Sequence, residues 1–287
     1  MKTLLIDNGS KRPAAVRNLR RIARALSERT GIAVDAVPLQ HADLIPAAAL
    51  DGEPARIFVD YMDAALADGC REFQILPLFF GASRALSAFI PEQIELLQAR
   101  HGAFVWRVGE VLCPLPAGEP RLAAILYDNV FAATAERLDG IDTVVLVDHG
   151  SPVARVTAVR NRLAELMRAY LPPTLPLLEC VMERREGPDY DFNGPLLQDS
   201  LDALASAGTV TRVVLAMLFL SPGRHAGEGG DIADIAAAAM RSHPGFEVLV
   251  APLVGEHPGL IELLAQRLHK LAADAPSATR IGVEPRD

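Results

Sequence analysis

The chain has 287 residues, half of them hydrophobic, and a formal net charge of −8, which allows a large buried core in one or two domains and argues against nucleic acid as the main partner. No apolar stretch approaches the roughly 20 residues of a membrane span, and the N-terminus turns acidic at Asp7, too early for a secretion signal. The three cysteines are widely spaced, which indicates reduced thiols in a cytoplasmic protein rather than disulfides or a thiolate metal site.

The first half of the chain alternates short apolar runs with segments of helical periodicity. These patterns predict, in chain order, strand 3–7, helix 13–30, strand 32–38, helix 57–67, strand 73–79, helix 91–100, strand 105–112 and helix 120–138.

The second half repeats this order. We expect strand 143–148, helix 153–170, strand 175–180, helix 195–205, strand 212–219, helix 231–242, strand 246–252 and helix 258–271. Continuous Val, Leu and Ile runs between helices are typical of a parallel sheet with both faces covered. The sequence therefore predicts an α/β fold of two tandem flavodoxin-like units, each a four-stranded parallel sheet with helices on both faces. The expected boundaries are 1–140 and 141–273, followed by a disordered tail, 274–287.

The two halves also share a motif, of which one copy is damaged. The tetrapeptide DHGS at 148–151 returns as DNGS at 7–10, and each copy follows an apolar strand. Beyond the third strand of each half, the second half has His225 where the first half has Ala85. The chain is thus a duplicated unit whose second half kept two histidines. This asymmetry predicts a single site, in the second half, and a first unit without metal ligands.

Three candidate ligands follow three strands of the second half. His149, Glu183 and His225 come after the first, second and third of these strands. In a flavodoxin-like strand order of 2-1-3-4, the three strands are neighbours, and ligands bind at their carboxyl ends. Two imidazoles and a carboxylate at one edge predict a divalent-metal site with open coordination positions.

Purely structural interpretations remain open for each of these residues. A single histidine in a turn is more often a surface or core residue than a ligand. Glu183 is one of three glutamates in its stretch, with Glu179 and Glu186, and Gly150-Ser151 can simply cap the next helix. The glycine-rich segment 223–231 lacks the lysine of a phosphate-binding loop.

The DHGS turn, the Leu218-Phe219-Leu220 strand end and the Gly223…His225…Asp231-Ile232 loop together resemble the sirohydrochlorin chelatases, in the long form with two fused units. The resemblance covers about residues 1–270. It implies ATP-independent insertion of cobalt or iron into sirohydrochlorin or a related tetrapyrrole, for cobalamin or siroheme synthesis, by a metal chelatase (a lyase). It also implies that His149 and His225 bind the metal, with Glu183 as the acidic helper.

The residues suit this chemistry. Imidazole binds cobalt or ferrous iron without the tight hold of a thiolate, and Glu183 is placed to accept a proton that the metal displaces. The ring's peripheral carboxylates need donors, for which we expect Arg224 first, with Ser151 and Arg184 as further substrate contacts. The expected partners are the tetrapyrrole and Co²⁺ or Fe²⁺ as substrates. We expect no permanently bound cofactor, no membrane contact, and a monomer with two pseudo-symmetric halves.

Two alternatives to an enzyme are distinguishable. A non-catalytic carrier of a tetrapyrrole or metal on the same fold would bind its ligand without turnover. A small-ligand or regulatory protein, in which the duplication serves only structure, would bind neither cobalt nor a tetrapyrrole.

Overall fold

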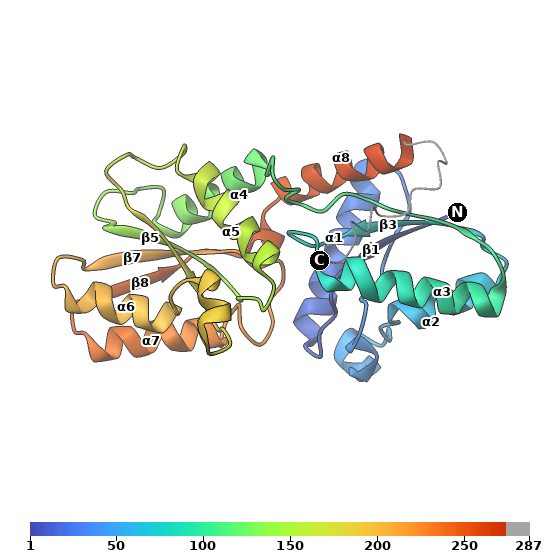
Figure 1. Ribbon diagram of the computed structural model, residues 1–287, viewed down its shortest axis with the longest axis horizontal. Coiled ribbons are helices and arrows are strands. Elements are labelled where there is room, and N and C mark those ends of the chain that lie inside the picture. Colours follow the sequence, from blue (N-terminus) through green and yellow to red (C-terminus); the bar gives the residue numbers. More distant parts are fainter. Residues whose placement is uncertain (274–287) are drawn as a thin grey trace. The chain divides into compact units, whose positions relative to one another are not determined.

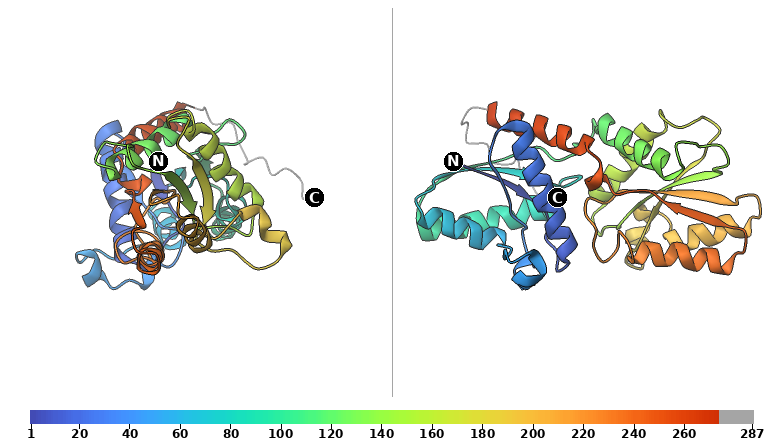
Figure 2. Two further views of the ribbon diagram at one scale, coloured as in Figure 1. Left: turned by 90° about the vertical axis from the view of Figure 1, so that its left-hand side faces the viewer. Right: turned by 180° about the vertical axis from the view of Figure 1, so that it is seen from behind.

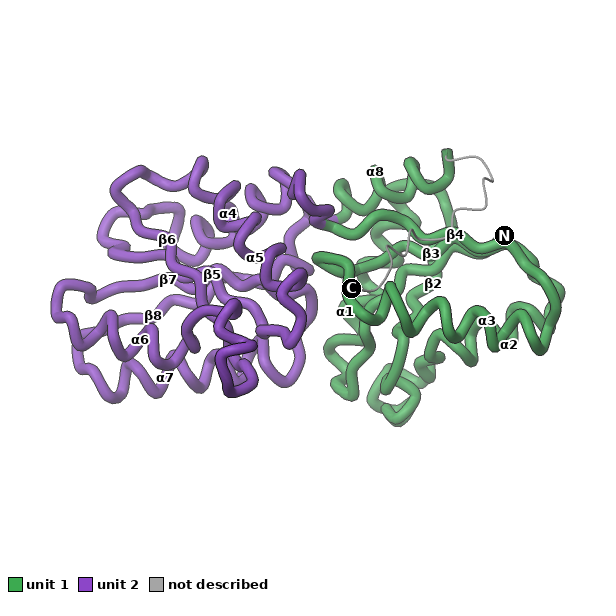
Figure 3. The backbone as a smooth tube through the Cα atoms, viewed as in Figure 1, with its two compact units in different colours: residues 1–112, 261–287 green, residues 113–260 purple. Residues whose placement is uncertain are grey.

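The computed structural model of the chain describes residues 1–273, which form two compact units (Figure 3). Of the described residues, unit 1 comprises Met1–Leu112 and 261–273, and unit 2 comprises Cys113–Leu260. Among the described helices, none is long and apolar enough to cross a membrane. The expected disordered tail, 274–287, lies outside the described residues.

Unit 1 is built on a four-stranded parallel sheet in the order β2-β1-β3-β4. In Figure 1, α1 and α8 lie over one face of this sheet and α2 and α3 over the other. Its elements are β1 (Lys2–Ile6), α1 (Pro13–Thr30), β2 (Val34–Ala36), the 3₁₀ turns η1 (Ala42–Leu44) and η2 (Ala47–Leu50), α2 (Phe58–Ala67), β3 (Glu72–Pro77), the π-turn η3 (Ala85–Phe89), α3 (Ile90–His101), β4 (Val105–Val108) and α8 (Gly259–Ala273).

Unit 2 repeats this architecture with the sheet order β6-β5-β7-β8, again all parallel. Helices α4 and α5 cover one face and α6 and α7 the other (Figures 1 and 2). Its elements are α4 (Pro120–Ala133), β5 (Thr143–Asp148), α5 (Ala154–Met167), β6 (Leu177–Val181), η4 (Pro188–Asn193), α6 (Leu197–Ser206), β7 (Arg212–Met217), α7 (Asp231–Ser242), β8 (Glu247–Val250) and η5 (Val254–Glu256). The predicted fold class and the 2-1-3-4 strand order are both confirmed.

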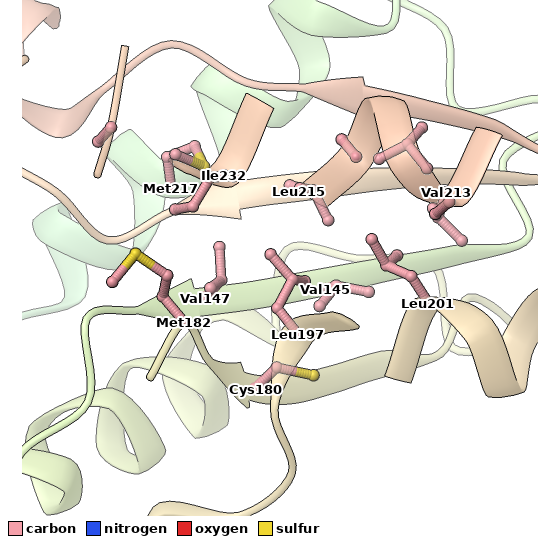
Figure 4. Close-up of a cluster of buried hydrophobic side chains, with 14 of the residues drawn as sticks. Val145, Val147, Cys180, Met182, Leu197, Leu201, Val213, Leu215, Met217 and Ile232 are labelled. Carbon is pink, nitrogen blue, oxygen red and sulfur yellow. The ribbon is translucent and has the colours of Figure 1, made fainter. Parts of the chain in front are cut away.

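The central strands are apolar throughout because helices cover both faces of each sheet. All six side chains of β5 are buried. Successive side chains of a strand point to opposite faces, so Val145 and Val147 pack on one side, against Leu197 and Leu201 of α6 and Ile232 of α7 (Figure 4). A buried leucine or isoleucine contributes about 1.5–3 kcal/mol, so these contacts hold each helix firmly on its sheet.

Several elements are shorter than their apolar patterns predict, for local reasons. The helix expected over 120–138 ends at Ala133, because Ala135 and Glu136 take positive φ angles of 53° and 61° that no α-helix accommodates. The strand expected over 105–112 ends at Val108, before Gly109. In both cases the run of apolar residues in the sequence is longer than the helix or strand that the backbone hydrogen bonds define.

The boundary between the units differs from the expected one near residue 140. Helix α4 belongs to unit 2, where it packs on α5 and β7, although its chain position follows the first four strands. Helix α8 belongs to unit 1, where Arg29 of α1 donates two hydrogen bonds, of 2.6 and 2.9 Å, to the Glu262 carboxylate. Each half therefore supplies the last helix of the other unit.

This exchange predicts which fragment folds. Cys113–Leu260 alone should unfold cooperatively, whereas 141–273 should be unfolded or aggregated. The shorter fragment lacks α4, whose Leu122, Leu126 and Val130 are fully buried, and losing three such side chains removes about 5–9 kcal/mol, comparable to the whole stability of a domain. Thermal melts followed by circular dichroism compare the two. A cooperative melt of 141–273 at the temperature of the longer fragment would contradict the assignment of α4 to unit 2.

Candidate functional site

The carboxyl ends of β5, β6 and β7 bring the site loops to one edge of the second sheet. Asp148 of β5 is in register with Val181 of β6, and Val147 of β5 with Met217 of β7. The pairing continues beyond the strands, since Met182 N–H donates to the Asp148 carbonyl at 2.9 Å and Glu183 N–H to the His149 carbonyl at 3.1 Å. His149 and Glu183 therefore start from backbone positions that are already hydrogen-bonded to each other.

Gly150 makes this close approach possible. Its φ angle is 89°, and a Cβ atom built on it would lie 1.9 Å from the carbonyl oxygen of Glu183. No side chain fits there, and a positive φ of this size favours glycine in any case. The glycine of the DHGS turn thus serves to let two site loops touch.

The structure brings the three predicted ligands together in pairs. His149 Nε2 lies 3.2 Å from Glu183 Oε1. The rings of His149 and His225 meet edge to face, with centroids 4.6 Å apart and an interplanar angle of 73°. The side chain of His149 is 47% exposed and that of Glu183 61% exposed, so a substrate can reach both.

Both ring nitrogens of His149 face oxygen acceptors. Nδ1 lies 3.1 Å from the carbonyl oxygen of Gly150, and Nε2 faces the Glu183 carboxylate. A proton on Nδ1 is held by the carbonyl, so Nε2 is the nitrogen that can give up a proton or bind a metal. A cation that binds Nε2 has to displace the Glu183 carboxylate from its 3.2 Å contact.

His225 is oriented by an acidic residue of its own loop. Its Nδ1 lies 2.7 Å from Asp231 Oδ2, and Asp231 is the first residue of α7. A carboxylate at this nitrogen keeps the proton on Nδ1 and leaves the Nε2 lone pair for a ligand, as in many carboxylate–histidine–metal arrangements. Asp231 is thus the orienting partner of His225.

The three predicted ligands are adjacent, but they do not form a ready metal site in this structure. Within residues 1–273, no group of three or more His, Cys, Asp or Glu side chains is already spaced to hold a metal ion. The His149–Glu183 pair closes the space that a metal would use.

The three predicted substrate contacts differ in their surroundings. Arg224 is 74% exposed, with its Nε 3.7 Å from Asp231. Arg184 donates to Asp191 at 3.0 Å. Ser151 Oγ accepts a hydrogen bond from Val153 N–H at 3.0 Å and so shapes the turn before α5. Arg224 is therefore the most accessible cation of the three, and the substrate-binding roles of all three stay predictions.

A buried polar network lies directly beneath the His149 loop. The Arg160 side chain of α5, only 3% exposed, donates to Asp148 Oδ1 at 2.9 Å, to the Asn193 carbonyl at 2.8 Å and to the Cys180 carbonyl at 3.3 Å. Asn193 is fully buried and bonds both the N–H and the carbonyl of Ser151. Burial raises the pKa of Asp148, and the Arg160 guanidinium opposes this rise. Arg160 therefore links the end of β5, just before His149, to the end of β6 and to the loop at Asn193.

The sequence alone did not reveal the roles of three of these residues, although Asp231 belongs to the loop motif that carries the resemblance. Asp231 opens a helix six residues after His225, a spacing that does not by itself imply contact. Arg160 lies among the buried positions Val159, Leu163 and Ala164 of α5, and a charge in such a stripe was a usable signal. Asn193 carried no signal, because its role depends on a loop conformation.

The first half repeats the backbone of this site with different side chains. A Cβ on Gly9 would lie 1.8 Å from the carbonyl oxygen of Gln40, the same close approach as that of Gly150 to Glu183. Asn8 and Gln40 stand where the second half has His149 and Glu183, and Ala85 where it has His225. Amides bind divalent cobalt or iron poorly, and alanine does not bind them. These substitutions support the prediction of a single site in the second half, which stays a prediction.

Replacing Gly150 should disable the site more than it disables the fold. Gly150→Ala places a methyl group against the Glu183 carbonyl and must separate the loops that carry His149 and Glu183, so we expect binding of Co²⁺ to weaken at least tenfold. Gly140→Ala is the matched control: Gly140 also has a positive φ, 81°, but nothing lies within 4 Å of its Cβ position. The control should cost only about 1 kcal/mol of stability. Calorimetric titration with Co²⁺ and a thermal melt of both variants test this, and equal Co²⁺ affinities would refute the role given to Gly150.

A comparison with protein-family models matches residues 143–271 to the CbiX family. A comparison with curated protein sequences finds no match. The family match therefore covers the half of the chain that carries both histidines, and it agrees with the resemblance noted from the motifs.

Solved structures match nearly the whole chain. SirB from Bacillus subtilis with Fe³⁺ has a TM-score of 0.70 at 17% identity, over 95% of this chain and 96% of that one. SirB from Bacillus subtilis subspecies spizizenii in complex with cobalt has a TM-score of 0.63 at 16% identity, with the same coverage. CbiX of denitrifying bacteria has a TM-score of 0.60 at 19% identity, over 94% and 99% of the two chains. The chain therefore has the two-unit fold of these chelatase structures over nearly its whole length, and its histidine-bearing segment, residues 143–271, matches the CbiX family model.

Proposed function

We propose that this protein inserts a divalent metal, cobalt or iron, into sirohydrochlorin or a related tetrapyrrole without ATP. The observation that carries the proposal is the contact of His149 with both Glu183 and His225 at the carboxyl edge of the second sheet. The matched family model covers this segment, and solved relatives with the same fold are described with Fe³⁺ and with cobalt. Cobalamin or siroheme synthesis is the process that uses this reaction.

Each residue has a distinct task in the proposed reaction. Insertion replaces two pyrrole N–H protons with one M²⁺, so the site must deliver a metal and remove protons. His149 and His225 receive the metal through Nε2, and Asp231 keeps His225 in the tautomer that can bind it. Glu183, in contact with His149 Nε2, accepts one of the two protons as the metal passes to the ring, and an imidazole that has released the metal accepts the other. Arg224 is the first candidate contact for a peripheral carboxylate of the ring.

We also propose that the protein works in the cytoplasm as a monomer, with metal and tetrapyrrole as its only partners and no resident cofactor. The two sheets support the monomer, because one chain supplies both units of the fold that matches the solved structures. Size-exclusion chromatography with light scattering tests the oligomeric state.

Turnover separates an enzyme from a carrier. Purified protein is mixed anaerobically with sirohydrochlorin and an excess of Co²⁺ or Fe²⁺, without ATP, and the absorbance of the metallated ring is followed. The proposal requires many product molecules per protein molecule. One equivalent of bound, slowly exchanging product would identify a carrier, and no change in the spectrum would exclude both functions.

The role of Glu183 as proton acceptor predicts a loss of rate rather than of affinity. Glu183→Gln keeps the size of the side chain but removes its charge and basicity. We expect kcat to fall roughly 10²-fold with little change in KM for the tetrapyrrole. Glu186→Gln, on an exposed residue of the same loop, is the control. An unchanged kcat in Glu183→Gln would assign the proton to another acid.

A further inference from the structure

The first unit contains a pocket at the edge that corresponds to the histidine site of the second. It has a volume of about 260 Å³ and lies where β1, β2 and β3 end. Its polar side chains are Asn8, Gln40, Arg84 and Glu92, and Phe89 and Leu39 supply an apolar wall. The loss of metal ligands in this half has therefore left a pocket with a different chemistry rather than a filled surface.

The backbone frame of this pocket is intact. Gly9, with a φ of 83°, approaches the Gln40 carbonyl as closely as Gly150 approaches that of Glu183. Asp7 stabilises the turn by accepting a hydrogen bond from Gly9 N–H at 3.0 Å. The side chains of Asn8 and Gln40 thus leave the two loops at adjacent points, and each offers an amide N–H₂ group where the second half has an imidazole and a carboxylate.

Arg84 differs from its counterpart in the second half in having no acidic partner. Arg224, at the matching position, lies 3.7 Å from Asp231. Counted from the matched strands, the position of Asp231 is occupied in the first half by Pro91. Among residues 1–273, no carboxylate lies within ion-pair distance of Arg84, although Glu92 lines the same pocket. The guanidinium is therefore available to a ligand.

From this donor set we propose that the first-half pocket binds the carboxylate group of an organic acid. Arginine and two amides donate to a single carboxylate, and Phe89 and Leu39 pack on the carbon frame that bears it. Glu92 disfavours a doubly charged phosphate, because a second negative charge would face it without a second cation. The carboxylate belongs either to a separate small acid or to the tetrapyrrole; in the second case the inference rests on the proposed function.

The test uses the full-length protein and three probes in calorimetric titrations. Benzoate represents a free acid on an apolar frame, metal-free uroporphyrin represents a ring with peripheral carboxylates, and inorganic phosphate represents a doubly charged anion. Each is titrated into the wild type, into Arg84→Met, into Gln40→Leu, and into Arg100→Met. Arg100 is an exposed arginine at the far end of α3 that pairs with Asp63, and its variant is the control.

We expect benzoate or uroporphyrin to bind the wild type, and phosphate to bind more weakly than either. Arg84→Met and Gln40→Leu should weaken the binding of the acid at least tenfold, whereas Arg100→Met should leave it unchanged. Binding of benzoate identifies a free acid as the ligand, and binding of uroporphyrin alone identifies the ring. If neither probe binds, or if Arg84→Met binds both as the wild type does, the inference is wrong. His149→Ala separates the two proposals, since it should abolish metal insertion and leave benzoate binding intact.

Discussion

His149→Ala should abolish metal insertion, with kcat/KM for the metal at least 10³-fold below the wild type. The substitution removes a side chain that contacts both Glu183 and His225, so on the proposed mechanism the metal loses a ligand and the proton acceptor loses its partner. Because the His149 side chain is half-exposed and its contacts lie within the site, the melting temperature should change little. The measurement is anaerobic insertion of Co²⁺ into sirohydrochlorin, together with calorimetric binding of Co²⁺ alone.

The first half provides the matched control. Asn8→Ala changes the equivalent position on an equivalent backbone, and insertion should remain within a few-fold of the wild type. A loss in Asn8→Ala as large as that in His149→Ala would show that both halves take part in the chemistry, and the single-site assignment would have to be abandoned.

A pH series adds an independent check on the imidazoles. Neutral imidazole binds a metal and imidazolium does not, so Co²⁺ binding should weaken as the pH falls. In His149→Ala this dependence should be reduced, because one of the two competing protons is gone.

Arg160→Met should have the largest effect on stability of any single substitution near the site, about 3–5 kcal/mol. The Arg160 side chain is 3% exposed and that of Asp148 11% exposed, so the variant leaves a carboxylate in the interior without its cation. It also removes the hydrogen bonds to the Asn193 and Cys180 carbonyls. Urea unfolding of the full chain measures the change. Arg155→Met, on the exposed face of the same helix, should change stability by less than about 0.5 kcal/mol.

The direction of the pH dependence distinguishes a lost ion pair from lost packing. Burial already raises the pKa of Asp148, and without Arg160 it should rise further. The first half contains a natural comparison: Leu19 stands where the second half has Arg160, and desolvation raises the pKa of Asp7 to about 6. A carboxyl whose pKa is higher in the folded than in the unfolded chain costs stability as the pH rises through that range.

The deficit of Arg160→Met should therefore be largest at pH 7–8 and shrink toward pH 4, where Asp148 is protonated. Adding Asp148→Asn should restore part of the stability at pH 7–8 but not at pH 4. A deficit that is the same at both pH values would show that Arg160 acts through packing alone, and the positioning of the His149 loop by an ion pair would then be wrong.

The fold class could be predicted from local sequence patterns, because these patterns do not depend on which other segments they contact. Uninterrupted apolar runs such as Val144–Val147, each followed by a segment of helical periodicity, are typical of parallel strands covered on both faces. The DHGS turn marked where the chain leaves the sheet. Strand order then followed from the general behaviour of such folds. His149, Glu183 and His225 were found because their positions just beyond strand ends are a property of the chain order.

Only the tertiary structure decided which helix covers which sheet and what surrounds each ligand. The chain position of α4, after the first four strands, does not say which sheet the helix covers, and only its contacts with α5 and β7 assign it to unit 2. The contacts of Asp231 with His225, and of Arg160 with Asp148 and Asn193, join residues on different elements through side-chain directions. Such directions depend on loop backbones held by Gly150 and by the buried Asn193, and no periodicity in the sequence encodes them.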